Sequence, residues 1–381
     1  MDQGKTGKSG IEFLRNNSLR TVDYWLVIPI LSITTIGLYV LNLVLSQGFK
    51  DYPVIFYKQV IAVIMGAIIA LVICLLDTQF MKLIGWILYG VSILLLIWVR
   101  IDGFTLADTW GADSWMQLPF LGTFQPSELT KIGLVIISSY VLEDMGTKTI
   151  TMIRGWVYLG LIYAPPMLLI LKQPDFGTAM VIVFSFVCML FIWNLKYRYF
   201  LLAISGIVVG VLPLVWNFYL APYQKKRILS LIFEGSDPVA EYNLVQSKRA
   251  IASGGLTGNR TGILVNVPVK QSDFIYSAVS ERMGFIGTTA IVVLAFFFLL
   301  RCLYVASKAA RKAYSYIVVG LTGSFAFHFI ENMGMCVGLL PITGIPLPFV
   351  SHGGTAMMVN FISLGFILNI SMDRKSSADR F

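Results

Sequence analysis

The sequence has 381 residues, of which 57% are hydrophobic and 13% are charged, and its mean hydropathy is +0.77. Soluble domains have about 45–50% apolar and about 25% charged residues, so this composition excludes an ordinary soluble protein and indicates a membrane protein. The formal net charge of +9 does not require a nucleic-acid partner, because membrane topology explains most of the basic residues.

The remaining composition argues against several kinds of site. The polar, basic start lacks a short apolar segment with a cleavage site, so no cleaved signal peptide is expected. The four cysteines all fall inside apolar runs, which favours neither a disulfide framework nor a zinc site. The only histidines are His328 and His352, so a histidine metal cluster or a Ser/His/Asp triad is not expected.

Apolar runs along the chain predict an all-α polytopic membrane protein with about ten transmembrane helices. The expected spans are residues 25–46, 56–76, 80–99, 126–142, 156–171, 176–193, 199–220, 284–303, 314–340 and 355–372. This gives one membrane domain, 23–372, between an N-terminal segment, 1–22, and a short tail, 373–381.

The distribution of Lys and Arg predicts the orientation. Basic residues concentrate in the termini and in the loops on the same side, whereas the short loops opposite hold few of them. Both termini are therefore predicted to be cytoplasmic. Two long loops, 101–125 and 221–283, then lie on the outer face, the second between helices 7 and 8.

A few ionisable residues lie at or near membrane depth, where charges are costly and often mark a cavity or pathway. Glu128 and Lys131 are three residues apart and can pair on one helix face. Because Pro126 precedes them, a helix start with an acid in its first turn is an equally good interpretation. Asp175 follows Pro174 and could equally be a helix N-cap. His328 is expected to be a satisfied core histidine.

The outer loop 221–283 is basic and contains few acids, notably Asp273. Arg and Lys clusters on a membrane face suit phosphate groups, although such a run can also be a solvated surface. Asp273 could act as a general base, or it could cap the helix that begins near Phe274. The Pro- and Gly-rich segment 341–354 predicts a broken helix or a tight connection at the same surface.

Taken in order, the polar motifs resemble the SEDS family of membrane peptidoglycan glycosyltransferases (shape, elongation, division and sporulation) over nearly the whole chain. The Thr-Gly-Ile-Pro-Leu-Pro-Phe run, 343–349, is most similar to the RodA branch rather than the FtsW branch. The motifs are FQPSELTK at 124–131, KQPDFGT at 172–178, SGG at 253–255, SDFIY at 272–276 and GLLPITGIPLPFVS at 338–351.

The resemblance implies a bacterial enzyme of the cytoplasmic membrane that polymerises lipid II into glycan during cell elongation. Its substrates are lipid II and the undecaprenyl-pyrophosphate-linked glycan, its partner is a class B penicillin-binding transpeptidase, and no nucleic acid is involved. No cofactor is certain, and a divalent cation, Mg²⁺ or Mn²⁺, is a candidate helper. Asp273 matches the family's catalytic carboxylate. The expected substrate-binding residues are Trp115, Glu128, Lys131, Asp175, Arg227, Gln246, Ser247, Glu281 and Ser351.

The chain departs from the family pattern near the proposed active face. Ser114 stands where the family usually has Arg, Arg282 replaces the second acid of a Glu-Glu pair, and His352 replaces a Tyr. The run 268–272, Pro-Val-Lys-Gln-Ser, replaces a segment with Pro-Glu and a His or Thr. Two alternatives therefore stay open: a flippase or transporter of lipid-linked precursor, and a catalytically weak scaffold for a cell-wall synthase.

Overall fold

The computed structural model describes residues 22–46, 52–102, 114–118, 122–206, 236–260 and 263–378, with a few single positions between 207 and 235. Its helices are α2 (Tyr24–Leu45), α3 (Val54–Leu75), η1 (Thr78–Phe80), α4 (Met81–Asp102), α6 (Pro126–Gly146), α7 (Met152–Lys172), α8 (Phe176–Ile192), α9 (Tyr197–Gly206), α12 (Pro238–Ser253), α13 (Ile275–Ser307), α14 (Lys312–Val337) and α15 (Gly354–Ala378). One antiparallel hairpin joins β1 (Met116–Leu118) to β2 (Gly122–Phe124).

Seven of the described helices are long and apolar enough to cross a membrane: α2, α3, α4 with η1, α7, α13, α14 and α15. The apolar α8 is shorter, at 17 residues, and α6 is long but contains several charged residues. The predicted helical membrane fold is thus confirmed. The count of about ten stays a prediction, because only α9 is described as a helix in the expected span 199–220.

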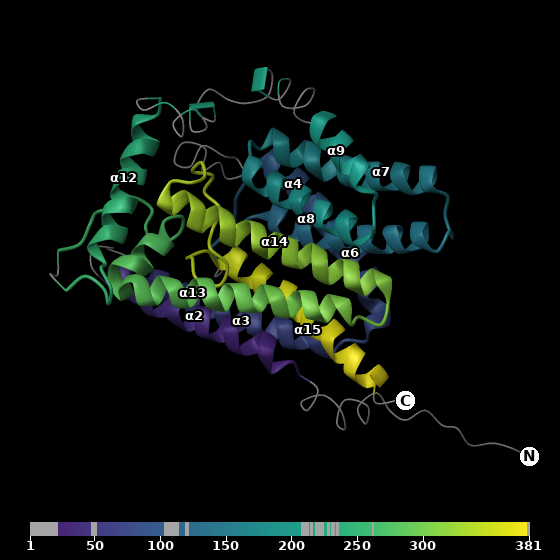
Figure 1. Cartoon of the computed structure of the whole chain (residues 1–381), viewed down its shortest axis with the longest axis horizontal. Coiled ribbons are helices and arrows are strands. Elements are labelled where there is room, and N and C mark those ends of the chain that lie inside the picture. The colour runs from purple at the N-terminus through teal and green to yellow at the C-terminus, as the bar shows by residue number, and fades with distance from the viewer. Residues whose placement is uncertain are drawn as a thin grey trace, which may run out of the picture.

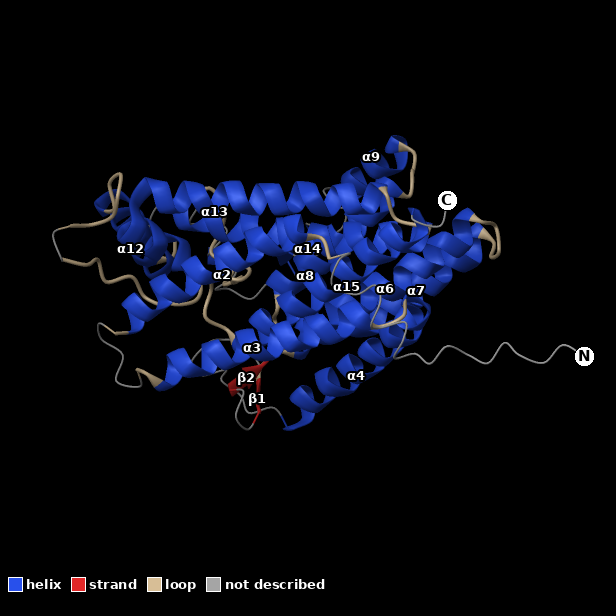
Figure 2. Cartoon of the chain, turned by 90° about the horizontal axis from the view of Figure 1, so that it is seen from below, coloured by secondary structure: helices blue, strands red, loops and turns tan. Residues whose placement is uncertain are grey.

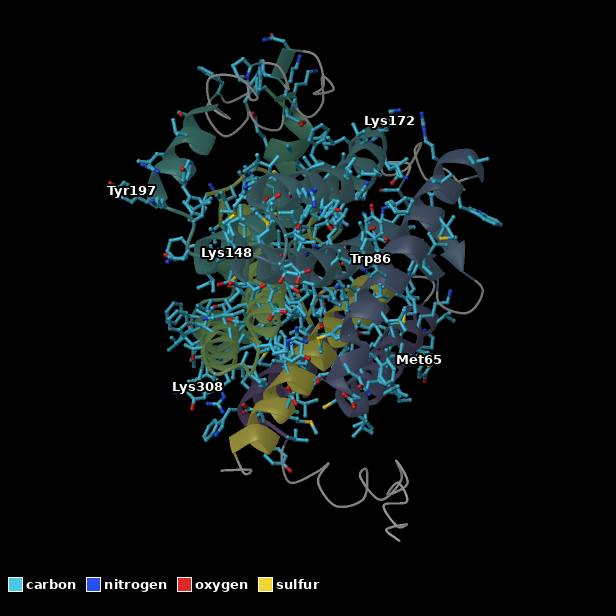
Figure 3. The ribbon with its side chains drawn as sticks, turned by 90° about the vertical axis from the view of Figure 1, so that its right-hand side faces the viewer. Met65, Trp86, Lys148, Lys172, Tyr197 and Lys308 are labelled. Carbon is cyan, nitrogen blue, oxygen red and sulfur yellow. The ribbon has the colours of Figure 1, made fainter. Side chains whose placement is uncertain are left out.

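The helices lie roughly along one direction and form a bundle (Figure 1). The beginning of α2 and the end of α15 lie at one end of the bundle, whereas α12 lies at the other end and runs across the direction of α13 (Figure 1). Figure 3 looks at the first of these ends, where Lys148 and Lys308 follow α6 and α13. The hairpin lies near α3 (Figure 2), and its β2 strand contacts α15. We call the end that holds α12 the α12 end.

The bundle presents apolar side chains outward, as expected of helices that face lipid. Met65 of α3 and Trp86 of α4 lie on its surface (Figure 3), with 41% and 45% of their areas exposed. Inside, α14 packs against α6, α8, α12, α13 and α15 and is the central helix of the described structure. Serine and threonine hydroxyls within the bundle bond to helix carbonyls, for example Ser185 to Gly320.

A cluster of four aromatic rings forms part of the core. Phe298 of α13, Phe325 of α14 and Phe361 of α15 surround Phe349, with ring centroids 5.3–6.4 Å from that of Phe349. Phe349 belongs to the connection between α14 and α15 and is 1% exposed. Because fully burying such a ring stabilises by about 1.5–3 kcal/mol, this insertion anchors the connection within the bundle.

Helix α13 begins earlier than the span predicted from the apolar run, which starts at residue 284. The helix begins at Ile275 and breaks at Gly284, whose φ of 66° is in the left-handed region that favours glycine. The backbone N–H groups of Phe285 and Ile286 donate to the carbonyls of Gly255 and Leu256. The turn after α12 therefore supplies hydrogen-bond acceptors to the backbone N–H groups at the break. The hydropathy pattern alone did not reveal the polar helical turns between Ile275 and Gly284.

Candidate functional site

Asp273 lies in the turn immediately before α13, at the α12 end. Its side chain is half-buried, and its Oδ1 accepts a hydrogen bond of 2.9 Å from Ser272 Oγ. The Nδ2 of Asn332 on α14 donates to its backbone carbonyl at 2.8 Å. The N-cap residue of α13 is Phe274, which makes no side-chain cap. The structure therefore does not place Asp273 at the cap position that the sequence left open.

The connection between α14 and α15, residues 338–353, is non-helical and lies against Asp273. Asn332 Nδ2 also donates to the Ile345 carbonyl at 2.8 Å, so one amide fixes both this connection and the Asp273 turn. A Cβ built at Gly344, where φ is 76°, would lie 3.4 Å from Asp273 Oδ2. The carboxylate thus faces the backbone of the connection, and the predicted break in the helices is confirmed here.

Ser351 holds this connection to the turn from the other side. Its hydroxyl donates to the Ser272 carbonyl at 2.7 Å and accepts from Leu347 N–H at 2.8 Å. On α3, the Gln59 amide donates to the Ser351 carbonyl at 3.1 Å and accepts from Gly353 N–H at 3.1 Å. The structure gives Ser351 an internal bonding role, and its contact with substrate stays a prediction.

A second polar cluster lies at the beginning of α6, where Pro126 occupies the first turn as predicted. Lys131 Nζ lies 2.8 Å from Glu128 Oε1 and 3.0 Å from His328 Nε2, and the Glu128 and Lys131 side chains are about 95% buried. Because the ammonium group donates to Nε2, His328 Nδ1 donates to the Pro346 carbonyl, 3.2 Å away. The predicted pairing and the satisfied core histidine are both observed.

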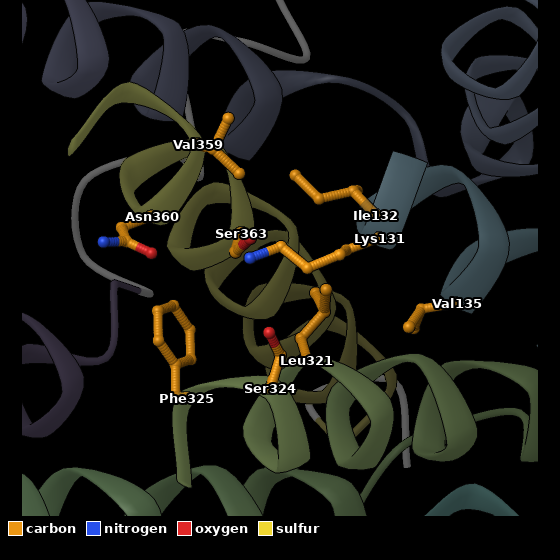
Figure 4. A pocket seen from close by; sticks show the side chains of 9 residues that line it. All are labelled: Lys131, Ile132, Val135, Leu321, Ser324, Phe325, Val359, Asn360 and Ser363. Atoms are coloured by element: carbon orange, nitrogen blue, oxygen red, sulfur yellow. The ribbon is translucent and has the colours of Figure 1, made fainter. Parts of the chain in front are cut away.

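This buried cluster also borders a small cavity. Lys131 lines it together with Ser324 of α14 and with Asn360 and Ser363 of α15, and the ammonium group points toward Ser363 (Figure 4). Glu128 Oε2 is buried without a hydrogen-bond partner. Of the predicted pair, Lys131 lines this cavity and Glu128 does not.

Asp175 joins the beginnings of α6 and α8. Its Oδ1 accepts from Thr178 N–H at 3.1 Å, so it caps α8, as one interpretation of the sequence predicted. Its Oδ2 accepts from Gln125 Nε2 at 2.7 Å and from Ser127 Oγ at 3.2 Å. Asp175 therefore lies next to the first turn of α6, one turn before Lys131.

Glu281 differs from Asp273 although both belong to the same stretch of chain. It is 0% exposed, it forms an ion pair with Lys270, and its Oε1 accepts from Val265 N–H at 2.7 Å. A carboxylate engaged in this way cannot reach a sugar hydroxyl without leaving Lys270 unpaired. Direct contact of Glu281 with substrate stays a prediction that this geometry does not favour.

The other expected site residues are more dispersed. Ser247 of α12 is buried and donates to the Cys336 carbonyl at 2.8 Å, whereas Gln246 is half-exposed. Trp115 is half-buried and immediately precedes β1. Arg227 lies outside the described residues.

Sequence reasoning missed the residues that position the site through long-range bonds. These residues are Asn332, Gln59 and Lys270. The first donates to the Asp273 carbonyl, the second to the Ser351 carbonyl, and the third to the Glu281 carboxylate. Nothing in the sequence around Asn332, Gln59 or Lys270 marks its bonding partner.

The electrostatics at the rim of the site are set partly by His352, which replaces the family's usual Tyr. Burial, and then the nearby Lys58 cation, lower the pKa of His352 below its usual value. His352 is therefore neutral at neutral pH and adds no charge beside the turn. Within the described ranges, no group of three or more His, Cys, Asp and Glu residues is placed to hold a metal ion.

The fold and these two clusters define a class of protein: a helical membrane protein with a half-buried carboxylate at one end of the bundle and a buried charge cluster beneath a broken connection. The family model for FtsW, RodA and SpoVE, described as cell cycle proteins, matches residues 21–376. The chain belongs to this family, and the motifs that indicated the SEDS family are confirmed.

Relatives in the family have similar lengths. Peptidoglycan glycosyltransferase MrdB of Escherichia coli strain K12 is 30% identical over 325 residues, which is 84% of this chain and 86% of MrdB. Stage V sporulation protein E of Bacillus subtilis strain 168 is 32% identical over 365 residues, 92% of this chain and 96% of that protein.

Solved structures agree with the sequence relatives. A chain of a peptidoglycan synthase complex, solved to show how polymerization and crosslinking are coordinated, is 28% identical with a TM-score of 0.78. That match covers 93% of this chain and 98% of the other. The crystal structure of the rod shape determining protein RodA of Thermus thermophilus is 26% identical, with a TM-score of 0.68 over 93% of this chain and 97% of the other.

Proposed function

We propose that this protein is a membrane peptidoglycan glycosyltransferase that polymerises lipid II, with Asp273 as the general base. The enzyme class agrees with the family and with MrdB, whose name states this activity. The observation that carries the assignment of the base is the environment of Asp273: a half-buried carboxylate on a backbone that α14 anchors through Asn332.

The reaction needs a base and a way to stabilise a leaving group. The 4-hydroxyl of the incoming lipid II attacks the anomeric carbon of the growing glycan, and the bond from that carbon to undecaprenyl pyrophosphate breaks. Asp273 takes the hydroxyl proton, because a carboxylate within hydrogen-bond reach can do so. Basic groups stabilise the negative charge that develops on the pyrophosphate.

The cations for the pyrophosphate come from the basic outer loop. Lys248 and Arg249 of α12 are exposed at the α12 end, and Arg227 is proposed as a further contact. A requirement for Mg²⁺ or Mn²⁺ stays a prediction.

The cluster around Lys131 is proposed to border the path of the lipid-linked substrate. Glu128, Lys131 and Asp175 lie at the beginnings of α6 and α8, and His328 links Lys131 to the connection that faces Asp273. A groove open to lipid would let the polyprenyl chain stay in the bilayer while the sugars reach Asp273.

The proposed partner is a class B penicillin-binding transpeptidase. The structural relative from a complex that coordinates polymerization and crosslinking supports a partnership of this kind. Copurification of such a transpeptidase from native membranes is the expected result, and failure to recover any would contradict the proposal.

Both termini are proposed to be cytoplasmic, with α12 on the outer face. A cysteine introduced at Ser376, near the end of α15, should be protected from a membrane-impermeant thiol reagent in intact cells, whereas one at Ser236, just before α12, should be labelled. Labelling of both sites from the same side would contradict this topology.

Polymerisation of lipid II is the direct test of the proposed function. Purified protein, alone and with the transpeptidase, is expected to convert fluorescent lipid II into glycan strands. Transfer of lipid II across vesicle membranes without polymerisation would favour a transporter. Inactivity of the chain, when the transpeptidase is crosslinking-competent and bound, would favour a scaffold.

A further inference from the structure

The turn that presents Asp273 contains an unusual backbone conformation. Val269, four residues before Asp273, has a φ of +52°. A β-branched side chain in the left-handed region is strained, at a cost of order 1–3 kcal/mol, and such a residue persists only where its surroundings enforce it. Here the sequence has Val where the resemblance implies an acid.

The strained residue organises the backbone that leads to Asp273. The carbonyl of Val269 accepts from Ser272 N–H at 3.2 Å and from Phe274 N–H at 3.5 Å. These two donors flank Asp273 directly, so the position of the Asp273 peptide depends on the direction of the Val269 carbonyl. If Val269 relaxed to negative φ, that carbonyl would turn away.

Lys270, the residue that follows Val269, forms a buried ion pair with Glu281 of α13. The Lys270 side chain is 10% exposed and that of Glu281 is 0% exposed. Both also bind the same residue of the loop: Glu281 Oε1 accepts from Val265 N–H at 2.7 Å, and Lys270 Nζ donates to the Val265 carbonyl at 3.1 Å. The backbone on both sides of Val269 is thus fixed to the first turns of α13.

We propose that the buried Lys270–Glu281 pair is a positioning device that enforces the left-handed conformation of Val269 and so directs the Asp273 carboxylate toward the acceptor hydroxyl. This inference rests on the proposed function and adds two positioning residues to it. Glu281 then acts through Lys270 and the turn, and it neither takes the proton nor contacts the substrate.

The pair can be removed without leaving a lone buried charge. In a Lys270→Met, Glu281→Gln variant, the glutamine oxygen can still accept from Val265 N–H, but the ionic link is lost. A misplacement of reacting groups by about 1 Å can cost on the order of 10²-fold in rate, so we expect a loss of kcat of that size with little change in KM for lipid II.

Relief of the strain should reverse this effect. Glycine adopts positive φ without a steric cost, so the turn no longer needs the ion pair when Val269 is replaced. Adding Val269→Gly to the double variant should recover at least about tenfold of the lost kcat. Because Val269→Gly also relieves strain in the folded state as a whole, kcat is compared per folded protein, and a role of the pair in global stability alone predicts the same kcat for all these variants.

Hydrogen exchange of the purified proteins gives a readout that does not depend on activity. Removing the pair should speed exchange of the Ser272 and Phe274 amides, and Val269→Gly should restore their protection. The matched control is Asp23→Asn with Arg301→Met, because Arg301 of that bidentate, partly buried pair lies about 30 Å from Glu281 along α13. The control should change neither the exchange of these amides nor kcat.

Several outcomes would overturn the proposal. Unchanged exchange of the Ser272 and Phe274 amides, failure of Val269→Gly to restore protection, or a rise in KM at constant kcat would each do so. If the double variant does not fold, Glu281→Gln alone should give a smaller change in the same direction, and no change would count against the pair. If the parent does not polymerise lipid II, the proposed function fails, and the exchange data still decide the role of the pair.

Discussion

Two regions of this protein hold acidic side chains near the proposed substrate path, and they differ in how their charges are satisfied. At the beginning of α6, Glu128 and Lys131 are almost fully buried and bind each other and His328. In the turn before α13, Asp273 is half-buried, Asn332 donates to its backbone carbonyl, and Ser272 donates to its carboxylate. The first region neutralises charge inside the bundle, whereas the second presents charge at its end.

The comparison separates two roles that the sequence could not separate. A general base must exchange its proton with a substrate, so it needs an accessible carboxylate on a fixed backbone. The carboxylate of a buried ion pair lacks this access, because it could reach a substrate only by leaving its partner as an uncompensated buried charge. By this criterion Asp273 suits proton transfer, and Glu128 and Glu281 suit positioning.

The largest effect on stability is expected from breaking the buried pair at α6. Lys131→Met should lower the free energy of unfolding by about 3–5 kcal/mol, because Glu128 is left without a cation. Adding Glu128→Gln should return part of the loss. Thermal unfolding in detergent measures both effects, and an unchanged Tm for Lys131→Met would show that the two regions do not differ in this way.

A smaller effect is expected from Asn332, which links the connection to the Asp273 turn. Asn332→Leu leaves the carbonyls of Asp273 and Ile345 without their donor, at a cost of about 1–3 kcal/mol. Asn369→Leu is the matched control, since its buried amide also bridges carbonyls, at the end of α3. Both variants should lose similar stability, but only Asn332→Leu should lower polymerisation by folded protein. Equal polymerisation by both would contradict the positioning role.

The smallest effect is expected from Arg311, whose side chain is 52% exposed in its ion pair with Glu143. Exposed pairs contribute about 0–1 kcal/mol, so Arg311→Met should change stability by less than about 1 kcal/mol. Glu143 would still accept from Ala313 N–H at the start of α14. Urea or thermal denaturation that showed a loss as large as that of Lys131→Met would remove the distinction between buried and exposed pairs.

The sequence predicted the features that follow from local composition. Long apolar runs gave the spans, because only helices satisfy the backbone in lipid, and Pro126 with Glu128 marked the beginning of α6. The Pro- and Gly-rich run predicted the break between α14 and α15. These signals lie within one turn or one span of the residues that they describe.

What the sequence could not predict depends on contacts between distant segments. Lys131 and His328 are 197 residues apart, and Gln59 and Ser351 are 292 apart, so no spacing rule joins them. Helix α13 continues before Gly284 because its polar turns, with buried Ser277 and Glu281, pack against α12 and the following loop. Hydropathy could not detect a helical segment made from such residues.

The most direct test of the account is polymerisation of lipid II by Asp273→Asn beside Asp237→Asn, each with the transpeptidase partner. Asparagine keeps the shape of Asp273 but cannot take the proton, so the rate should fall by about 10²–10⁴-fold while the protein stays folded. Asp237 caps α12 through Ala240 N–H at 3.1 Å, and asparagine caps equally well, so Asp237→Asn should stay near the parental rate. Near-parental polymerisation by folded Asp273→Asn would contradict the assignment of the base.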